Sequence, residues 1–178
     1  RGLGDVYKRQ GIPSLLPRCS GTARRGEKVT QTTICFKMRK IERIFVHCTA
    51  GSQRQSIEDL KAEFRLKGWK YPGYHYVVDI NGGIHQLLAI ELVSNGVKGY
   101  NSSAINVAYM GGIDSHGKPI DNRTPDQKDA LILLLHRLKQ QFPDAKIMGH
   151  RDIWGTDCKK WKKYCPCFDA MSEYKDIE

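Results

Sequence analysis

The spacing of apolar positions from residue 38 onward predicts an alternation of strands and helices. Short runs rich in β-branched and aromatic residues predict strands at residues 43–48, 74–79, 84–88, 105–110 and 146–149. Asn81 and Gly82 lie between the second and third runs, and this dipeptide is typical of a tight hairpin turn. Strands interleaved with helices favour a single α/β domain, with one mixed β-sheet and helices packed on it.

Two segments have the helical period, and each begins with a capping signal. The stretch SIED predicts that Ser56 caps a helix that ends at Gly68. Thr124 predicts a second, longer helix, because Pro125 suits its first position and Gln127 completes a capping box. The buried face of the longer helix is predicted to consist of apolar residues at helical spacing: Ala130, Leu131, Leu134, Leu135 and Leu138.

The first 37 residues show neither pattern. Their opening, RGLGDVYKRQ, resembles a translated adapter or vector string, and the first methionine is Met38. We therefore expect residues 1–37 to be a disordered or non-native extension, residues 38–172 to be the folded domain and residues 173–178 to be a C-terminal tail. The alternative for the first segment is a native basic tail that binds a partner.

The formal net charge of +10 is concentrated in this first segment. Residues 1–37 hold eight basic and two acidic residues, or +6, which leaves +4 for residues 38–178. A mildly basic domain suits nucleic acid, a membrane surface or a cell-wall polymer equally, so charge alone does not choose a partner. A nucleic-acid-binding module is disfavoured because no aromatic-basic motif supports it. No apolar run approaches the roughly 20 residues of a membrane span.

Six cysteines in 178 residues are too sparse for a small disulfide scaffold, and no secretory signal precedes them. A reduced, cytoplasmic setting with metal-binding thiolates is therefore favoured. Cys158, Cys165 and Cys167 lie close together, but the paired Cys-x-x-Cys elements of a structural zinc knuckle are absent.

Two histidines follow or end predicted strands, where functional groups converge in an α/β sheet. They are His47 in HCTA and His150 in GHRD. Two imidazoles, one thiolate or carboxylate and an open fourth position form the pattern of a catalytic zinc site. The spacing alone leaves Cys158, Cys165 and Cys167 open as the source of the thiolate.

Other residues of the same types have a simpler interpretation. Cys48 points to the opposite face of its strand from His47 and is predicted to be a small core residue. Cys167 is interpreted as a packing residue, with a reversible disulfide to Cys158 as the alternative. The remaining histidines are predicted to be structural or exposed: His75, His85, His116 and His136.

Six segments extend this picture: IFVHCTA, GWKYPGYHYVVDINGGIHQ, KGYNSSAINVAYMGGIDSHGKP, the TPDQ helix start, GHRD and KKYCPCFD. In this order, over roughly residues 41–169, they resemble the zinc-dependent N-acetylmuramoyl-L-alanine amidases of the peptidoglycan-recognition (type 2 amidase) family. The resemblance is close to the phage lysozyme-type amidases. The resemblance implies the peptidoglycan-recognition-protein-like amidase fold, and hydrolysis of the amide between N-acetylmuramic acid and the L-alanine of the stem peptide.

The resemblance also implies roles for individual residues. Zn²⁺ would be held by three ligands: His47, His150 and Cys165. Tyr74 and Lys163 would be catalytic, positioning the attacking water and stabilising the oxyanion. Thr49 and Asn101 would bind substrate. The expected partner is peptidoglycan, with no nucleic acid, for a monomer that accumulates in the cytoplasm and reaches the wall on holin-type lysis.

Two departures from the family pattern qualify these expectations. Close relatives have a histidine before the KGYN segment, where this chain has Gly96, which affects the expected substrate contacts. The segment between GHRD and Lys163 is longer than in the shortest relatives and introduces Cys158 as a rival zinc ligand. The alternative function is a non-catalytic peptidoglycan-binding protein of the same fold, which would typically have lost the cysteine ligand.

Overall fold

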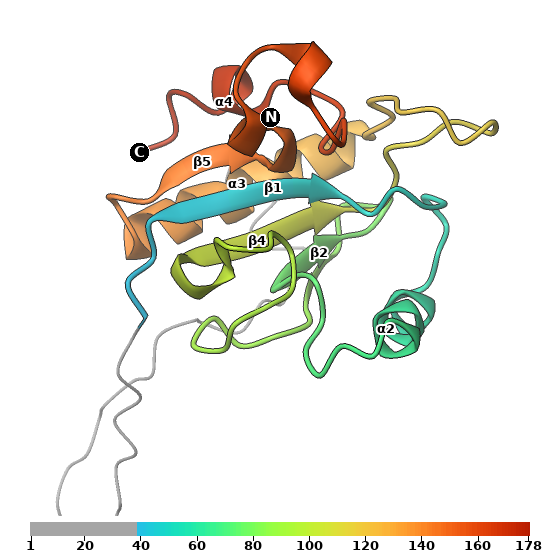
Figure 1. Ribbon diagram of the computed structural model, residues 1–178, viewed down its shortest axis with the longest axis horizontal. Coiled ribbons are helices and arrows are strands. Elements are labelled where there is room, and N and C mark those ends of the chain that lie inside the picture. Colours follow the sequence, from blue (N-terminus) through green and yellow to red (C-terminus); the bar gives the residue numbers. More distant parts are fainter. Residues whose placement is uncertain (1–38) are drawn as a thin grey trace, which may run out of the picture. The chain divides into compact units, whose positions relative to one another are not determined.

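A computed structural model describes residues 39–178 (Figure 1). The expected extension at residues 1–37, and Met38 as the start of the domain, lie outside the described residues. The described strands are β1 (Arg43–Cys48), β2 (Tyr76–Val78), β3 (Ile84–Gln86), β4 (Ala104–Tyr109) and β5 (Lys146–Gly149). They form one mixed sheet in the order β3-β2-β4-β1-β5, in which only the β2–β3 pair is antiparallel.

The predicted strands are confirmed, but β2 and β3 are shorter than the apolar runs suggested. The side chain of Asp79 explains where β2 ends. Its Oδ1 accepts hydrogen bonds from the backbone N–H groups of Asn81 and Gly83, each at 2.9 Å. This local turn replaces the strand ladder after Val78 and leads directly into the antiparallel partner.

Both predicted helices begin at their predicted caps. The hydroxyl of Ser56 accepts from the N–H of Asp59 at 3.0 Å, and α2 runs over Ile57–Leu66. Thr124 and Gln127 form the complete capping box that starts α3 (Pro125–Gln141), with both bonds at 3.1 Å. Gly68 follows α2 with a φ of +70°, a conformation that glycine adopts without steric cost.

The two helices cover opposite faces of the sheet. Helix α3 packs its predicted apolar face on the side that carries Ile44 and Val46, and it passes behind the sheet in Figure 1. Helix α2 packs Leu60 and Phe64 against the other side. Because strand residues alternate between faces, Ile44 and Val46 on the α3 side place His47 on the α2 side.

The C-terminal segment contains structure that the sequence pattern did not predict. Two short 3-10 turns, His150–Trp154 and Cys158–Lys160, precede the helix α4 (Ala170–Glu173), whereas a third, Asn101–Ser103, lies directly before β4. Tyr174 is only 2% exposed, and Ile177 packs against the same core. The packing therefore continues beyond residue 172, where the sequence pattern placed the end of the domain.

A buried arginine connects this segment to the rest of the core. The Arg123 guanidinium donates five hydrogen bonds, two to Asp121, two to Glu173 and one to the hydroxyl of Tyr174. It also lies 3.2 Å from the ring centroid of Phe168. All five donors of the side chain are satisfied, so this ionic group is stabilised by internal partners alone.

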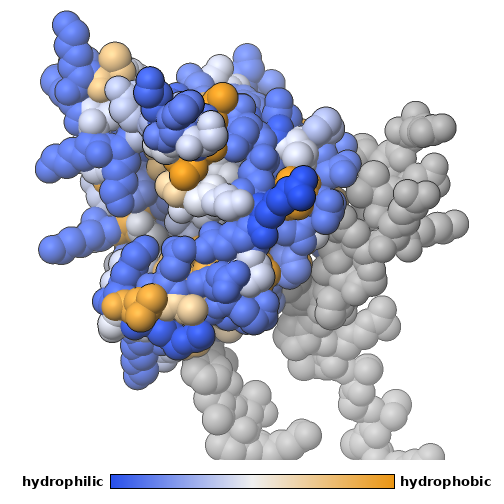
Figure 2. Space-filling view, turned by 90° about the vertical axis from the view of Figure 1, so that its right-hand side faces the viewer, coloured by the Kyte–Doolittle hydropathy of each residue, from blue (hydrophilic) through white to orange (hydrophobic). Residues whose placement is uncertain are grey.

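Among residues 39–178, no helix has both the length and the apolar character needed to cross a bilayer. On the face shown in Figure 2, apolar residues form small separate areas among polar ones. Nothing on that face resembles a broad apolar contact surface.

Candidate metal centre and active site

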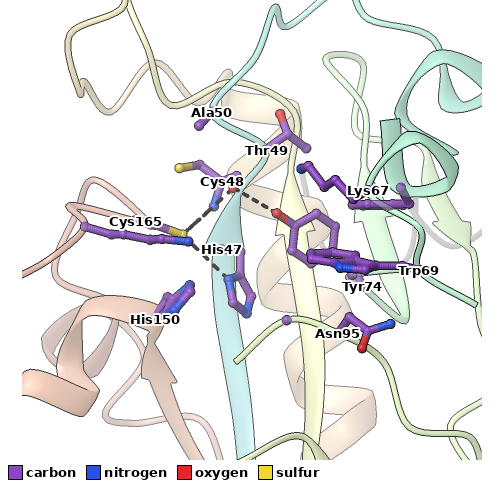
Figure 3. A pocket seen from close by; sticks show the side chains of 14 residues that line it. His47, Cys48, Thr49, Ala50, Lys67, Trp69, Tyr74, Asn95, His150 and Cys165 are labelled. Carbon is purple, nitrogen blue, oxygen red and sulfur yellow. Dashed lines mark hydrogen bonds between the residues drawn. The ribbon is translucent and has the colours of Figure 1, made fainter. Parts of the chain in front are cut away.

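His47, His150 and Cys165 converge at one edge of the sheet. His47 lies near the end of β1, and His150 directly follows β5. Because β1 and β5 are parallel neighbours, their carboxyl ends meet at the same edge. The ligand atoms of these two histidines and of Cys165 all lie within 4.8 Å of one another. The two imidazole rings are 4.9 Å apart between centroids, and Cys165 Sγ is 3.6 Å from His47 Nδ1 (Figure 3).

Backbone contacts hold Cys165 beside the histidines. Its sulfur accepts from the N–H of Cys48 at 3.3 Å, and its carbonyl accepts from the N–H of Arg151 at 2.8 Å. The next carbonyl, of Pro166, accepts from the hydroxyl of Tyr109 at 2.7 Å. The segment that carries the thiol is thus tied to β1, to β4 and to the turn that carries His150.

The other cysteines lie elsewhere. Cys158 is exposed on its 3-10 turn and is outside the group of convergent ligand atoms. Cys48 is buried in the core on the α3 side of the sheet, as predicted. Cys167 packs against that core, and its sulfur lies 3.7 Å from the sulfur of Cys48. The thiol next to Cys167 is therefore that of Cys48, and not that of Cys158, the partner considered in the sequence analysis.

Burial keeps both histidines neutral near pH 7. His47 is 1% exposed and His150 is 7% exposed. Removal from water, together with the nearby Lys163 ammonium, lowers the pKa of His47 to about 4. Removal from water, with smaller contributions from His47 and Lys163, lowers the pKa of His150 to about 3. The neutral imidazole is the form that offers a lone pair to a metal ion.

Aromatic packing fixes the second histidine. The ring of His150 stacks on Trp154, with centroids 5.6 Å apart and planes 19° apart. Asp152 Oδ2 accepts from the N–H of Gly149 at 2.6 Å and so closes the turn that carries His150. Arg151 lies 4.1 Å from the ring centroid of Trp161 on the outer side of this turn.

An open pocket lies beside the three convergent residues (Figure 3). Tyr74, Thr49 and Lys163 line it, and the rings of Tyr74 and His47 are 5.2 Å apart between centroids. The Tyr74 hydroxyl donates to the carbonyl of Cys48 at 3.4 Å. Burial, together with nearby Cys165, raises the pKa of Tyr74 well above its usual value, so the side chain is a neutral donor at pH 7.

Asn101 is the one expected site residue that the structure does not bring to the pocket lining. Its Oδ1 instead accepts from the N–H of Val97 at 2.7 Å, inside the loop before β4. The sequence interpretation did not single out Lys67, Asn95 or Asn106, although the first two line the pocket and Asn106 contacts His47. The signal for Asn106 was present, since INVAYM places a single amide in an otherwise apolar strand.

Trp69 both packs on a neighbouring ring and lines the pocket. Its ring stacks on Phe64, with centroids 5.7 Å apart and planes 14° apart, so it packs at the end of α2. It also lines the pocket and is 36% exposed. Lys67 Nζ lies 5.3 Å from the centroid of the same ring. The wall opposite the convergent histidines is therefore aromatic and cationic.

Two neutral histidines and a cysteine around an open pocket, at the strand ends of a mixed sheet, define an α/β domain with a candidate mononuclear metal centre. The family model described as N-acetylmuramoyl-L-alanine amidase matches residues 37–168. The chain belongs to this family.

Individual relatives agree with this assignment. The endolysin of Klebsiella phage KP32 is 35% identical over 144 residues, which cover 80% of this chain and 91% of that protein. The solved structure of the endolysin from Thermus scotoductus bacteriophage Ph2119 is 26% identical, with a TM-score of 0.58 over 71% of this chain and 77% of that one.

A more distant structure shows the fold alone. Drosophila peptidoglycan recognition protein SD is 16% identical, with a TM-score of 0.59 over 79% of this chain and 83% of that one. The expected peptidoglycan-recognition-protein-like amidase fold is therefore confirmed.

Proposed function

We propose that this chain is a zinc-dependent amidase that hydrolyses the bond between N-acetylmuramic acid and the L-alanine of the peptidoglycan stem peptide. The observation that carries the proposal is the convergence of His47, His150 and Cys165 on an open pocket. Family membership supplies the substrate class, because the matching family model is that of N-acetylmuramoyl-L-alanine amidases.

The donor set fits Zn²⁺. Two imidazole nitrogens and one thiolate suit this ion, and three protein ligands beside a pocket are typical of catalytic rather than structural zinc. Zn²⁺ held in such a site supplies Lewis acidity and lowers the pKa of water toward about 7. Deep burial of His47 and His150 supports the assignment, because it keeps both imidazoles neutral and available as ligands.

The other pocket residues suit hydrolysis of an amide. The Tyr74 hydroxyl is a neutral donor beside His47, and it would orient the attacking water or the scissile carbonyl. The Lys163 ammonium lines the same pocket, and it would stabilise negative charge that develops on the carbonyl oxygen. Thr49 lies on the pocket wall and would contact the substrate, with its own hydroxyl oriented by the N–H of Gly111 at 3.1 Å.

A binding-only protein of the same fold is the second candidate. It would hold peptidoglycan against the aromatic and cationic wall of Trp69 and Lys67 without cleaving it. The complete ligand set favours the enzyme, because a binding-only relative would typically have lost the cysteine.

We further propose that the protein acts as a monomer and reaches the cell wall on lysis of the producing cell, as expected for a phage endolysin. The similarity to endolysins of phages supports this setting. Light scattering on the purified chain tests the first part, and a stable dimer at micromolar concentration would refute it.

The decisive experiment measures zinc and catalysis together on the full chain. Bound zinc is measured by elemental analysis, and cleavage is measured as new L-alanine amino termini released from purified cell walls. We expect one zinc ion per chain and continuous release of amino termini. A zinc-loaded chain that binds walls but releases no amino termini would establish the binding-only alternative.

Two cysteine variants form a matched pair. Cys165→Ser is expected to lose zinc and to lower activity by roughly three orders of magnitude, because metal catalysis contributes several kcal/mol to the barrier. Cys158→Ser makes the same chemical change on an exposed turn and is expected to behave like the wild type. The opposite pattern would transfer the ligand role to Cys158.

A further inference from the structure

Asn106 is a buried amide in direct contact with a candidate metal ligand. It lies in the middle of β4, is 0% exposed and is flanked by apolar residues along the strand. Its Oδ1 is 2.9 Å from Nε2 of His47. A buried amide is stable only when its donors and its acceptor are all hydrogen-bonded, so the partners of Asn106 fix how it is oriented.

Neighbouring groups determine which end of this amide faces His47. The backbone N–H of Val97 donates to Asn101 Oδ1 at 2.7 Å, so that oxygen is an acceptor. Asn106 Nδ2 lies 3.3 Å from this oxygen and 2.8 Å from Ser94 Oγ. The reversed orientation would place two amide oxygens against each other with no proton between them. The amino end of Asn106 therefore faces Asn101, and its oxygen faces His47.

This orientation determines the tautomer of His47. An amide oxygen can only accept, so Nε2 of His47 must carry the ring proton. The lone pair then resides on Nδ1, the nitrogen that faces Cys165 Sγ at 3.6 Å (Figure 3). We infer that Asn106 is a positioning residue of the metal centre, which holds His47 in the Nε2–H tautomer and directs its Nδ1 lone pair to the metal. The inference rests on the proposed function, because it gives that function's metal ligand a specific support.

A second histidine, His75, is hydrogen-bonded to the backbone of Asn106. The backbone N–H of Asn106 donates to His75 Nδ1 at 3.0 Å, and Ser94 Oγ lies 3.2 Å from the same nitrogen. His75 Nε2 lies 3.0 Å from the carbonyl of Leu92 and donates to it. His75, Ser94 and Asn106 are each 0% exposed. No bulk water competes for these bonds, so the network holds the Asn106 amide in one position.

Gly96 belongs to the same arrangement. A Cβ atom at this position would lie 2.3 Å from both Cγ and Oδ1 of Asn106, too close for any side chain unless Asn106 moved. The glycine is thus needed to make room for the amide that supports His47.

The tautomer is tested directly by nitrogen NMR of the metal-free full chain at neutral pH, with histidine labelled at both ring nitrogens. We expect the long-range proton–nitrogen pattern of His47 to be that of the Nε2–H tautomer. An Nδ1–H pattern would overturn the inference. The measurement uses the wild-type chain, so it does not depend on the folding of any variant.

Zinc affinity tests the consequence for the metal, by competition with a fluorescent chelator. Asn106→Leu keeps a similar size but removes the acceptor, and it is expected to weaken zinc binding about 10- to 100-fold, as loss of an outer-shell partner does. Asn106→Asp restores an acceptor and is expected to recover most of the affinity. Gly96→Ala is expected to weaken zinc binding by displacing Asn106 without altering it.

Gln127→Leu is the matched control. It removes another fully buried amide, whose Nε2 donates to the carbonyl of Met110 at 2.9 Å on the α3 side of the sheet. It is expected to lower the unfolding temperature and leave zinc affinity unchanged. Equal zinc affinity in Asn106→Leu and the wild type, or equal losses in Asn106→Leu and Gln127→Leu, would overturn the inference.

These results separate the inference from the proposed function. A chain that binds zinc through the Nε2–H tautomer but releases no L-alanine termini would refute the amidase and leave the role of Asn106 intact. An active amidase with His47 in the Nδ1–H tautomer would support the proposed function and refute the role of Asn106.

Discussion

Two polar clusters among residues 39–178, the one around Arg123 and the one formed by His47, His150 and Cys165, differ in how far internal partners satisfy their polar groups. Every donor of Arg123 is satisfied by Asp121, Glu173 or Tyr174. In the second cluster, the Nδ1 atom of His47 lies 3.6 Å from the sulfur of Cys165, which itself accepts from the N–H of Cys48. The ligand atom of His150 lies within 4.8 Å of the ligand atoms of both residues.

The difference distinguishes a structural cluster from a functional one. A charged group that is fully paired inside the protein contributes to stability and has no capacity left for a ligand. Ligand atoms that converge beside a pocket, by contrast, keep the capacity to bind a cation. The first cluster should therefore affect folding, and the second should affect metal binding and catalysis.

Among variants that keep all three metal ligands, Lys163→Met is expected to give the largest effect on activity. Removal of one donor to a developing oxyanion lowers kcat by about 10²- to 10³-fold, whereas zinc content should not change. The unfolding temperature should also be unchanged, because Lys163 is exposed. Steady-state release of amino termini and elemental analysis measure the two quantities. Lys162→Met removes the adjacent exposed lysine, and an equal loss there would refute a specific role for Lys163.

Arg123→Met is the corresponding change on the structural side. It leaves two carboxylates without their partner and should reduce the free energy of unfolding by about 3 kcal/mol, since Asp121 and Glu173 remain partly exposed. Urea unfolding measures this loss. Turnover per folded molecule should fall far less than in Lys163→Met. Arg54→Met, on the surface, should change stability by less than about 0.5 kcal/mol.

The buried histidines and the Arg123 cluster should lose their contributions to the free energy of unfolding at different pH values. Burial lowers the pKa of His75 to about 4 and of His47 to about 4, whereas the ordinary value is 6.5. Between pH 6.5 and about 4, these histidines are protonated in the unfolded chain but remain neutral in the folded chain. The free energy of unfolding is therefore highest above pH 6.5 and decreases as the pH falls toward 4. Each such histidine contributes about 1.4 kcal/mol per pH unit in this interval.

Urea unfolding of the metal-free chain at several pH values checks this dependence. In His75→Gln, the slope of the free energy of unfolding against pH should decrease by the contribution of one histidine, about 1.4 kcal/mol per pH unit. Asp121 behaves differently: burial raises its pKa, but the bonds from Arg123 outweigh this and hold the pKa below 3.8. Loss of the Arg123 cluster should therefore begin only at more acidic pH. A slope that is flat between pH 6.5 and 4 would contradict the buried, neutral state of the histidines.

Local features were predictable from the sequence because their causes are local. The caps at Ser56 and Thr124 involve groups three residues apart, and both helices begin where the sequence predicted. The strand β1 matches its apolar run, because a central parallel strand is buried on both faces and remains apolar along its length. Helix α4 was missed because four residues are too few to show a period.

The candidate site was only partly predictable. Resemblance to the family selected Cys165 among three nearby cysteines, and the structure places that residue beside the histidines. The support behind His47 could not be predicted, because Asn106 is 59 positions from it in sequence and only the sheet brings the two together. The resemblance to the family placed Asn101 at the substrate site, whereas in the structure its Oδ1 accepts from the N–H of Val97 and from Asn106 Nδ2.

The placement of β1 between β4 and β5 has a consequence for the synthesis of the chain. His47 and Cys165 are 118 positions apart, so the candidate metal centre joins β1 to a segment that is synthesised much later. Contacts of such high sequence separation form late, after the intervening loops have been closed. A ribosome-bound chain lacks the thiol until residue 165 has been added, so a shorter nascent polypeptide has no complete centre. Binding of a metal by all three ligands therefore requires synthesis through Cys165.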